Sequence, residues 1–330
     1  MVQTLYVSRQ GCTLALRQDT ILVRQQQEVI DSIQLPLLEQ LVIFGRSQVT
    51  TSVLQACLQR QIPVAYLSHV GYCYGRLMPT QNLSCHWVEA QHAMSDARRL
   101  QMAQRMIYAK LHNSRVLLQR QQRRINLPAL EPVIIQLGKL ARASLQAQSI
   151  EQLMGLEGAG AAAYFPALGL CLTNADFTLT RRSRRPPQDP VNALLSFGYQ
   201  VLWNHVLLAI EMKGLNPYRA CLHEPSNHHP ALASDLIEQF RAPIIDSVVL
   251  YLVNHRMVRV ADDFEVKGRA CYLSESGRRA FLRAFLQRMH SVAMVGDRKQ
   301  PQWALLSQQV KALIDCLQRP DATYQPFLIR

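Results

Sequence analysis

The sequence predicts an α+β protein of two domains, in which a small β-rich, sandwich-like domain precedes a larger all-α domain. Up to about Pro79, short runs of branched and aromatic residues alternate with turn formers, a pattern typical of strands. From about Val88 onwards, apolar residues recur at helical spacing. A chain of 330 residues, 48% of them hydrophobic, is long enough for two cores. We expect the β-rich domain over residues 1–80, a linker over 81–88 and the helical domain over 89–330.

The strands expected in the first domain are LYV, CTLAL, TILV, LVIFG, IPVAYLS and GYCYGRL, with TTSVLQACLQR as one short helix among them. This domain has almost no net charge and holds more apolar residues than roughly 80 residues of sandwich need to bury alone. We therefore expect it to mediate dimerisation.

The second domain is expected to be built from amphipathic and buried helices. Asp189 and Pro190 form a good cap and first turn for a helix that runs to about residue 213. A buried helix is expected over residues 247–254, with a kink at Pro243. Further elements are expected as helices over residues 98–124, 274–289 and 303–318 and a small hairpin within 256–273.

Several protein classes are excluded by composition. No run approaches the roughly 18 uninterrupted apolar residues of a membrane span, and the first ten residues lack the order of a signal peptide. The eight cysteines are scattered without a C-x-x-C pair, so neither a zinc ribbon nor a disulfide framework is indicated. We expect a cytoplasmic protein with buried thiols and no membrane partner.

The net charge predicts a polyanionic partner. Lys and Arg number 36 against 23 Asp and Glu, which gives +13 and a pI near 9.7. Residues 1–80 contain six Arg and four acids, a net of +2, so the remaining +11 lies downstream. We expect the polyanion to bind the second domain.

Two cationic segments are candidates for contact with DNA phosphates. No acid interrupts residues 98–124, and because solvated faces normally mix signs, this helix favours phosphate contact. Residues 181–185 read RRSRR and could grip phosphate, although a mobile surface loop is the commoner meaning of such a run. The cations concerned are Arg98, Arg99, Arg105, Lys110, Arg115, Arg120, Arg123, Arg124, Arg181, Arg182, Arg184 and Arg185.

The candidate site lies within residues 214–246. His223 follows turn formers and should lie on a loop, while Asp235 and Glu238 are three apart on a helix and project from nearly the same face. Carboxylates with one imidazole suit Mg²⁺ or Mn²⁺ rather than zinc. In a basic protein, such an ion usually catalyses phosphodiester transfer. The alternative is that the two acids only pair with arginines such as Arg241.

For Glu157 and three other histidines, the residue pattern by itself favours a structural role over a catalytic one. Glu157 lies among glycines and alanines that would let a backbone or ligand approach, but spacing alone favours an exposed side chain on a packed helix. His205 lies on an apolar helix and is expected to be a core residue. His228 and His229 are expected on the surface of a loop.

Four ordered segments give the chain a resemblance to a known family. They read VIFGRSQVTTSVLQACLQRQIPVAYLSHVGYCYGRL, GLEGAGAAAYF, RRPPQDPVNALLSFGY and GLNPYRACLHEPSNHHPALASDLIEQFRAPIID. Together they resemble the catalytic integrase subunit of CRISPR adaptation, a metal-dependent DNA endonuclease that inserts new spacers into CRISPR arrays of prokaryotes. The resemblance implies an N-terminal β-rich domain and a C-terminal helical catalytic domain.

The resemblance also implies roles for residues and partners. Glu157, His223 and Glu238 would hold one Mg²⁺ or Mn²⁺ ion, with Asp235 as an assisting acid. The DNA substrates would be a donor prespacer duplex and a CRISPR repeat. Homodimers would flank a small ferredoxin-like partner subunit in a heterohexamer. Two rival functions stay open, a structure-selective metal-dependent nuclease acting on branched or free DNA and a noncatalytic basic DNA scaffold.

Overall fold

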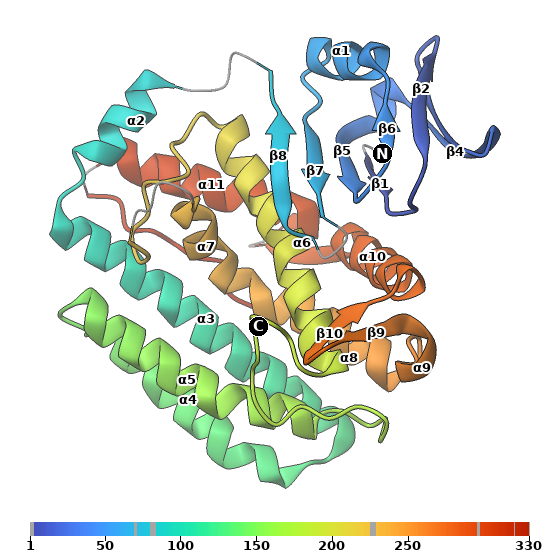
Figure 1. The fold of residues 1–330 in the computed structure, drawn as a ribbon. Helices are drawn as coiled ribbons and strands as arrows, with labels where there is room; N and C mark the ends of the chain where they lie inside the picture. Colours follow the sequence, from blue (N-terminus) through green and yellow to red (C-terminus); the bar gives the residue numbers. More distant parts are fainter. Residues whose placement is uncertain are drawn as a thin grey trace. The chain divides into compact units, whose positions relative to one another are not determined.

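The computed structural model describes residues 3–68, 71–79, 84–224, 229–295, 298–319 and 321–329. The chain divides into two compact units, Met1–Asn82 and Leu83–Arg330, and each is considered by itself. The first is built mainly from strands and the second mainly from helices, as the sequence predicts (Figure 1). Residues 81–83 of the expected linker lie outside the described residues. Its later part is helical, because helix α2 (Cys85–His92) begins at Cys85.

Within residues 3–68 and 71–79, two sheets enclose one apolar core. One has the strand order β1-β5-β7-β8, with β1, β5 and β7 parallel and β8 antiparallel to β7. The other has the order β4-β3-β2-β6. The elements are β1 (Gln3–Val7), β2 (Thr13–Arg17), β3 (Thr20–Gln25), β4 (Glu28–Gln34), η1 (Leu35–Leu37), β5 (Leu38–Phe44), β6 (Gln48–Val49), α1 (Thr51–Gln59), β7 (Val64–Leu67) and β8 (Cys73–Leu77).

The strand expectations are confirmed in this unit, and two further strands appear. Inward residues such as Leu14, Ile21, Leu41 and Val64 are fully buried in the shared core. β4 was not predicted because its residues, EVIDSIQ, include two acids and are mostly exposed at the edge of the sheet. An edge strand needs few apolar side chains facing the core, here Ile33 and the partly buried Ile30, so its sequence carries little periodic signal.

The second unit is predominantly helical. Its elements are α2 (Cys85–His92), α3 (Asp96–Ile125), η2 (Pro128–Leu130), α4 (Glu131–Ser144), α5 (Ile150–Leu170), α6 (Pro190–Met212), α7 (Ala231–Ile237), η3 (Glu238–Phe240), η4 (Arg241–Asp246), α8 (Ser247–Asn254), α9 (Val260–Asp263), β9 (Phe264–Lys267), β10 (Ala270–Leu273), α10 (Glu275–His290), β11 (Val292–Val295), β12 (Arg298–Pro301) and α11 (Gln302–Gln318). Several helices begin where the sequence places a side-chain cap. The carboxylate of Asp189 accepts from Asn192 N at 2.8 Å at the start of α6, and Ser274 caps α10.

Helices α3, α4 and α5 each pack against the other two (Figure 1). Gly160 on α5 makes the closest approach to α3, since a Cβ built there would lie 2.2 Å from Leu111 Cδ2. The small residues of this helix therefore bring its backbone against α3, one helical turn after Glu157.

Helix α6 is the core helix of this unit and contacts α7, α11, β10 and η4. It is long and apolar enough to cross a membrane by length and composition, yet 72% of its most apolar window is buried inside the protein. Its apolar character is thus accounted for by protein packing.

Residues 231–254 form one continuous helical segment of changing pitch. α7 gives way to a 3-10 turn (η3) at Glu238, then to a π-helix (η4), and then to α8. η4 contains Pro243, which has no backbone N–H to donate, so the expected kink takes the form of a π-helical widening. This change of pitch places Glu238 and Arg241 at the start of successive turns.

The close packing of α6 yields a stability prediction. A Cβ on Gly198 would lie 2.5 Å from Phe281 Cζ and 2.6 Å from Ile245 Cγ2, both in fully buried side chains. We expect Gly198→Ala to lower the unfolding free energy by roughly 1–3 kcal/mol, measured by denaturant unfolding. The control is Gly155→Ala on α5, where a Cβ would meet nothing within 4 Å, and helix propensity alone should stabilise it by up to about 1 kcal/mol. Equal effects at both positions would contradict the packing described.

Candidate active site

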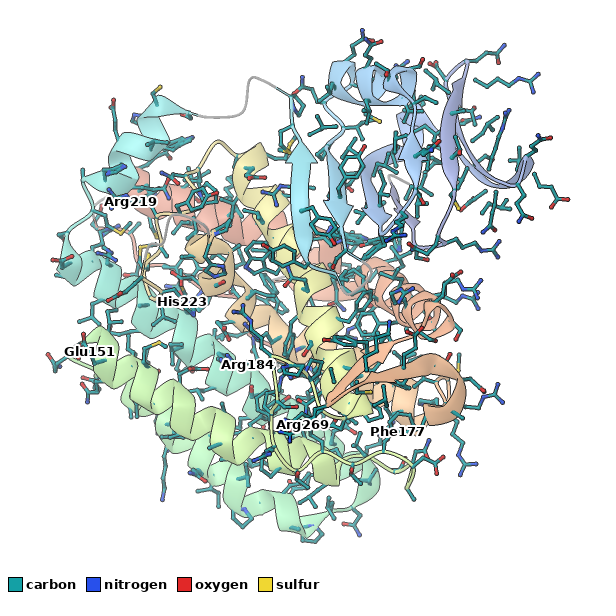
Figure 2. All side chains as sticks on the ribbon, viewed as in Figure 1. Glu151, Phe177, Arg184, Arg219, His223 and Arg269 are labelled. Atoms are coloured by element: carbon teal, nitrogen blue, oxygen red, sulfur yellow. The ribbon has the colours of Figure 1, made fainter. Side chains whose placement is uncertain are left out.

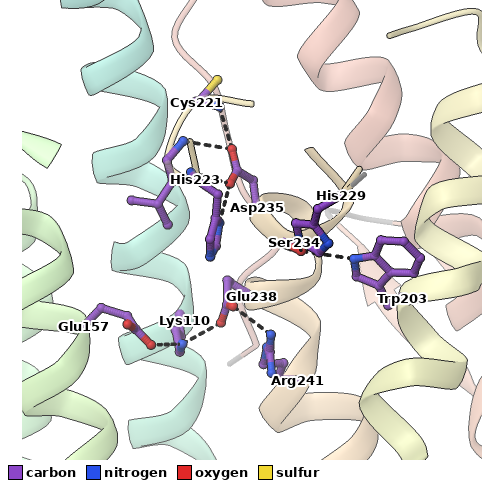
Figure 3. Close-up of polar contacts among 11 residues, drawn as sticks. Lys110, Glu157, Trp203, Cys221, His223, His229, Ser234, Asp235, Glu238 and Arg241 are labelled. Carbon is purple, nitrogen blue, oxygen red and sulfur yellow. Dashed lines mark hydrogen bonds and ion pairs between the residues drawn. The ribbon is translucent and has the colours of Figure 1, made fainter. Parts of the chain in front are cut away.

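Lys110 links the two glutamates that the sequence singled out. Its Nζ lies 2.6 Å from Glu238 Oε2 and also forms an ion pair with Glu157 (Figure 3). The side chains are largely buried, with 13% of Lys110, 17% of Glu157 and 5% of Glu238 exposed. Three elements thus meet at one ammonium group, α3 through Lys110, α5 through Glu157 and η3 through Glu238. Glu157 is therefore not the exposed helix residue that spacing alone favoured.

His223 is oriented by Asp235. Asp235 is fully buried on α7 and accepts three backbone N–H groups from Cys221, Leu222 and His223 at 2.6, 2.9 and 3.1 Å. Its Oδ1 also lies 2.7 Å from His223 Nδ1, and because a carboxylate only accepts, Nδ1 carries the proton. This bond raises the pKa of His223. The loop is thereby fixed and the Nε2 atom of His223 is left available to a ligand.

Glu238 remains ionised although it is buried. Burial by itself would raise the pKa of Glu238, but the charges of Arg241 and Lys110 outweigh it and lower the pKa to about 2. Arg241 NH2 lies 2.9 Å from Glu238 Oε1. The other oxygen, Oε2, is buried and lies 2.6 Å from Lys110 Nζ. Each carboxylate oxygen of Glu238 therefore faces a cation.

The residues fit a hard divalent cation in chemistry. Two carboxylates and one imidazole nitrogen are donors that Mg²⁺ and Mn²⁺ accept. Among the described residues, no three acidic, histidine or cysteine side chains are close enough to hold an ion as they stand. The Lys110 ammonium lies between the carboxylates of Glu157 and Glu238.

A small hollow of about 20 Å³ adjoins the site and is lined by three cations, three aromatic rings, one acid and five small or aliphatic residues. Its three cations are Lys110, Arg241 and Arg184. Figure 2 labels Arg184 and His223 in the helical unit. A hollow of this size holds about one water or one phosphate oxygen.

A buried acid supports Arg241 from below this hollow. Asp246 accepts hydrogen bonds of 2.6 Å from the hydroxyl groups of both Tyr164 and Tyr199. The Arg241 guanidinium lies over the Tyr199 ring, 4.5 Å from its centroid, and Arg182 lies over the same ring at 5.5 Å. This network connects Asp246 through Tyr199 and Arg241 to Glu238.

A family profile described as CRISPR associated protein Cas1 matches residues 5–287. This is most of the chain and includes Glu157, His223, Asp235 and Glu238. The chain belongs to the Cas1 family. The resemblance inferred from sequence motifs is thereby confirmed at the level of the family.

Curated Cas1 relatives are about one third identical to this chain. A CRISPR-associated endonuclease Cas1 3 of Thermus thermophilus is 34% identical over 336 residues, covering 98% of this chain and 95% of the relative. A Cas4/Cas1 exonuclease–endonuclease fusion of Geobacter sulfurreducens is 35% identical over 294 residues, and this chain spans 52% of its length. A solved Cas6-RT-Cas1–Cas2 complex contains a chain with TM-score 0.82 and 25% identity, covering 99% of this chain and 36% of that one.

The cations predicted to contact DNA occupy different environments. Lys110 belongs to the site, and Arg98 NH2 donates to the carbonyls of Cys316, Arg319 and Ala322 at 2.7 to 2.9 Å. Arg182 donates to Asn192 Oδ1 at 2.7 Å and to Ser196 Oγ at 2.9 Å, both on helix α6. Arg99, Arg105 and Arg115 are half-buried on α3. The exposed members are Arg120, Arg123, Arg124, Arg181, Arg184 and Arg185. Contact of these cations with DNA stays a prediction.

Of the three other histidines considered in the sequence, two lie within the described residues. His205 is buried against Phe285 and Trp303, and burial lowers its pKa to about 3, so the expectation of a core histidine is confirmed. His229 is exposed as expected, yet its Nε2 lies 2.8 Å from Ser234 Oγ and its ring stacks on Trp203. His228 lies outside the described residues.

Some site residues were missed by sequence reasoning. Lys110 was assigned to phosphate contact and Arg241 only to a rival pairing, while Tyr164, Tyr199 and Asp246 were not singled out. The pairing of Glu238 with Arg241 does occur, but Asp235 pairs with His223 instead. Lys110 has no acid three or four residues away on α3, so the local sequence gives no signal of an ion pair. Its partners lie on other elements, Glu157 on α5 and Glu238 on η3.

Asp246 gives a pH prediction. Burial raises its pKa from 3.8 to about 6, so the folded state binds this proton more tightly than the unfolded state. Its contribution to stability is therefore complete below the unfolded pKa and is lost as the pH rises through about 6. Relative to Asp246→Asn, the unfolding free energy of the wild type should increase by roughly 1–3 kcal/mol from about pH 7.5 to about pH 4.5 in denaturant titrations. A difference that does not vary with pH would contradict the raised pKa.

Proposed function

We propose that this chain is a metal-dependent DNA integrase of CRISPR adaptation, which joins a donor 3′-hydroxyl to the repeat boundary by transesterification. The observation that carries the proposal is the meeting of Glu157 and Glu238 at Lys110, beside an oriented His223, in a member of the Cas1 family. The chain spans about half of the first curated relative, so no activity of that relative's other half is carried over.

Glu157, Glu238 and Nε2 of His223 are proposed as ligands of one Mg²⁺ or Mn²⁺ ion. Such an ion, when bound, neutralises charge that develops on a phosphodiester and activates the attacking oxygen. Asp235 acts as the assisting acid by fixing the tautomer and direction of the His223 ring. Lys110 and Arg241 remain near the carboxylates as fixed cations, where they favour the negative charge of a transferring phosphoryl group.

The proposed substrates are two DNA molecules held together. The helix of residues 98–124 and the loop of residues 181–185 are separate cationic elements, which allows one to bind the donor and the other the target. Their contacts would be to phosphates, without reading bases. A hydroxyl held in line at the site gains a large effective molarity over a freely diffusing one, which favours joining over hydrolysis.

The second candidate function is a structure-selective metal-dependent nuclease. It would use the same residues, and the curated relatives, which are named endonucleases, favour it. Water rather than a donor hydroxyl would then be the nucleophile. A noncatalytic DNA scaffold is disfavoured, because a scaffold has no need for buried carboxylates gathered around a histidine.

The assembly proposed is a homodimer that binds a small ferredoxin-like subunit in a heterohexamer, in the cytoplasm of a prokaryote. The family member found in a Cas1–Cas2 complex supports a second subunit. Residues 1–80 are proposed to mediate dimerisation. Large apolar side chains exposed there, among them Val29, Tyr72 and Tyr74, supply surface for such contact.

Removing a proposed ligand should separate catalysis from DNA binding. We expect Glu157→Gln, His223→Ala and Glu238→Gln each to slow strand joining about 100-fold or more, because the metal site loses a donor. DNA affinity should change less than about 2-fold, since phosphate contacts come mainly from arginines. The measurements are joining of a labelled donor duplex to a repeat plasmid and fluorescence anisotropy. Glu224→Gln, an exposed carboxylate next to His223, is the matched control and should join normally.

The nucleophile distinguishes an integrase from a nuclease. A donor with a 3′-dideoxy end lacks the attacking hydroxyl, so it should bind with unchanged affinity and give no covalent product with a supercoiled plasmid that carries a repeat. Gel analysis of labelled donor and plasmid measures both joining and cutting. If the plasmid is cut equally with either donor and never joined, the chain is a nuclease instead.

A further inference from the structure

The segment of residues 322–329 is folded against the turn that carries Glu238, and the family profile does not include it. That profile matches residues 5–287. Residues 322–329 follow helix α11 without helix or strand structure of their own. Tyr324 is nevertheless 1% exposed, among the largest fully buried side chains of the described residues. A segment this well packed has a definite place in the structure.

Gln239, the residue after Glu238, is the point where this segment contacts η3. Gln239 is 1% exposed, and its Oε1 accepts from Phe327 N at 2.6 Å. Its Nε2 donates to the Tyr324 hydroxyl at 3.0 Å. The rings of Phe240 and Phe327 stack with centroids 5.7 Å apart. Both residues that follow Glu238 in η3 are therefore fixed by the segment.

Asn113 ties the same segment and the same turn to α3. Asn113 is fully buried, and its Nδ2 donates to Gln239 O at 2.7 Å and to Phe327 O at 2.9 Å. Its Oδ1 accepts from Ile329 N at 3.0 Å. Asn113 lies one helical turn after Lys110, so one face of α3 presents both the ammonium that meets Glu238 and the amide that fixes η3.

We propose that residues 322–329 are a positioning segment for Glu238, which fixes η3 against α3, the helix on which α5 with Glu157 also packs. The segment acts through the hydrogen bonds of Gln239 and Asn113. A turn that carries a metal ligand must resist the pull of the ion and of the Lys110 charge, and hydrogen bonds behind the ligand supply that resistance. The inference rests on the proposed metal site.

The test measures Mn²⁺ binding by the full-length protein, from the electron paramagnetic resonance signal of the free ion. Asn113→Ser removes the three hydrogen bonds of Asn113, and Gln239→Met removes those of the Gln239 side chain. Each should weaken Mn²⁺ binding about 10- to 100-fold. The matched control is Asn254→Ser. Asn254, at the end of α8, also joins two segments through its amide oxygen and nitrogen: it accepts from Thr173 N at 2.8 Å and donates to Cys171 O at 2.9 Å. Both partners follow α5 and neither belongs to η3 or to residues 322–329, so this variant should bind Mn²⁺ normally.

A second readout separates positioning from general damage to the fold. In strand joining, Asn113→Ser and Gln239→Met should require more Mn²⁺ for half-maximal rate and recover a maximal rate within about 2-fold of wild type, since saturating metal restores the site by mass action. If either variant does not fold, Tyr324→Phe replaces it. It removes one hydroxyl and should weaken Mn²⁺ binding about 5-fold.

The outcomes distinguish this inference from the proposed function. If Glu238→Gln binds Mn²⁺ as the wild type does, the ligand set is wrong. If Glu238→Gln loses binding while Asn113→Ser, Gln239→Met and Tyr324→Phe keep wild-type affinity, residues 322–329 do not position Glu238. A maximal joining rate that stays low at saturating Mn²⁺ also overturns the inference, because it indicates a damaged fold.

Discussion

The arrangement of the helical unit depends on one interaction, the ammonium of Lys110 between the carboxylates of Glu157 and Glu238. Two carboxylates largely removed from water repel each other, and a cation between them offsets that repulsion. Arg241 compensates part of the charge of Glu238. Lys110 supplies the second positive charge and is shared with Glu157, so one side chain of α3 holds α5 and η3 together.

This site requires three elements that are distant in sequence, α3, α5 and η3, to lie close together in a fixed arrangement. Gly160 allows α5 to lie against α3, because any side chain there would meet Leu111. The π-helix η4 directs Arg241 towards Glu238, and Asp246 with its two tyrosine donors supports the Tyr199 ring on which Arg241 lies. Each contact is modest on its own. Together they hold the carboxylates in one arrangement, as catalysis by positioning requires.

Local patterns predicted the elements well and the site only in part. Caps such as Ser274 and the 3.6-residue periodicity placed the helices, because those signals depend on neighbours in sequence. The spacing of Asp235 and Glu238 likewise located the site-bearing helix. Glu157 could not be found in this way, since its partner Lys110 lies 47 residues away on another helix. The resemblance to a family supplied it, because a family motif records a tertiary contact that spacing cannot show.

A count of charges along the sequence is limited for the same reason, because it does not show which cations are paired within the protein. The basic helix of residues 98–124 was interpreted as one phosphate-binding surface, yet α3 is buried along much of its length and its cations have separate tasks. Lys110 meets the acids, Arg98 satisfies three carbonyls at the end of α11, and Arg123 and Arg124 remain exposed. A cation can bind a DNA phosphate only when its hydrogen-bond donors are not already used within the protein. A guanidinium with its donors satisfied gains little from a phosphate. Net charge therefore identifies the class of partner, while the hydrogen bonds decide which cations can meet it.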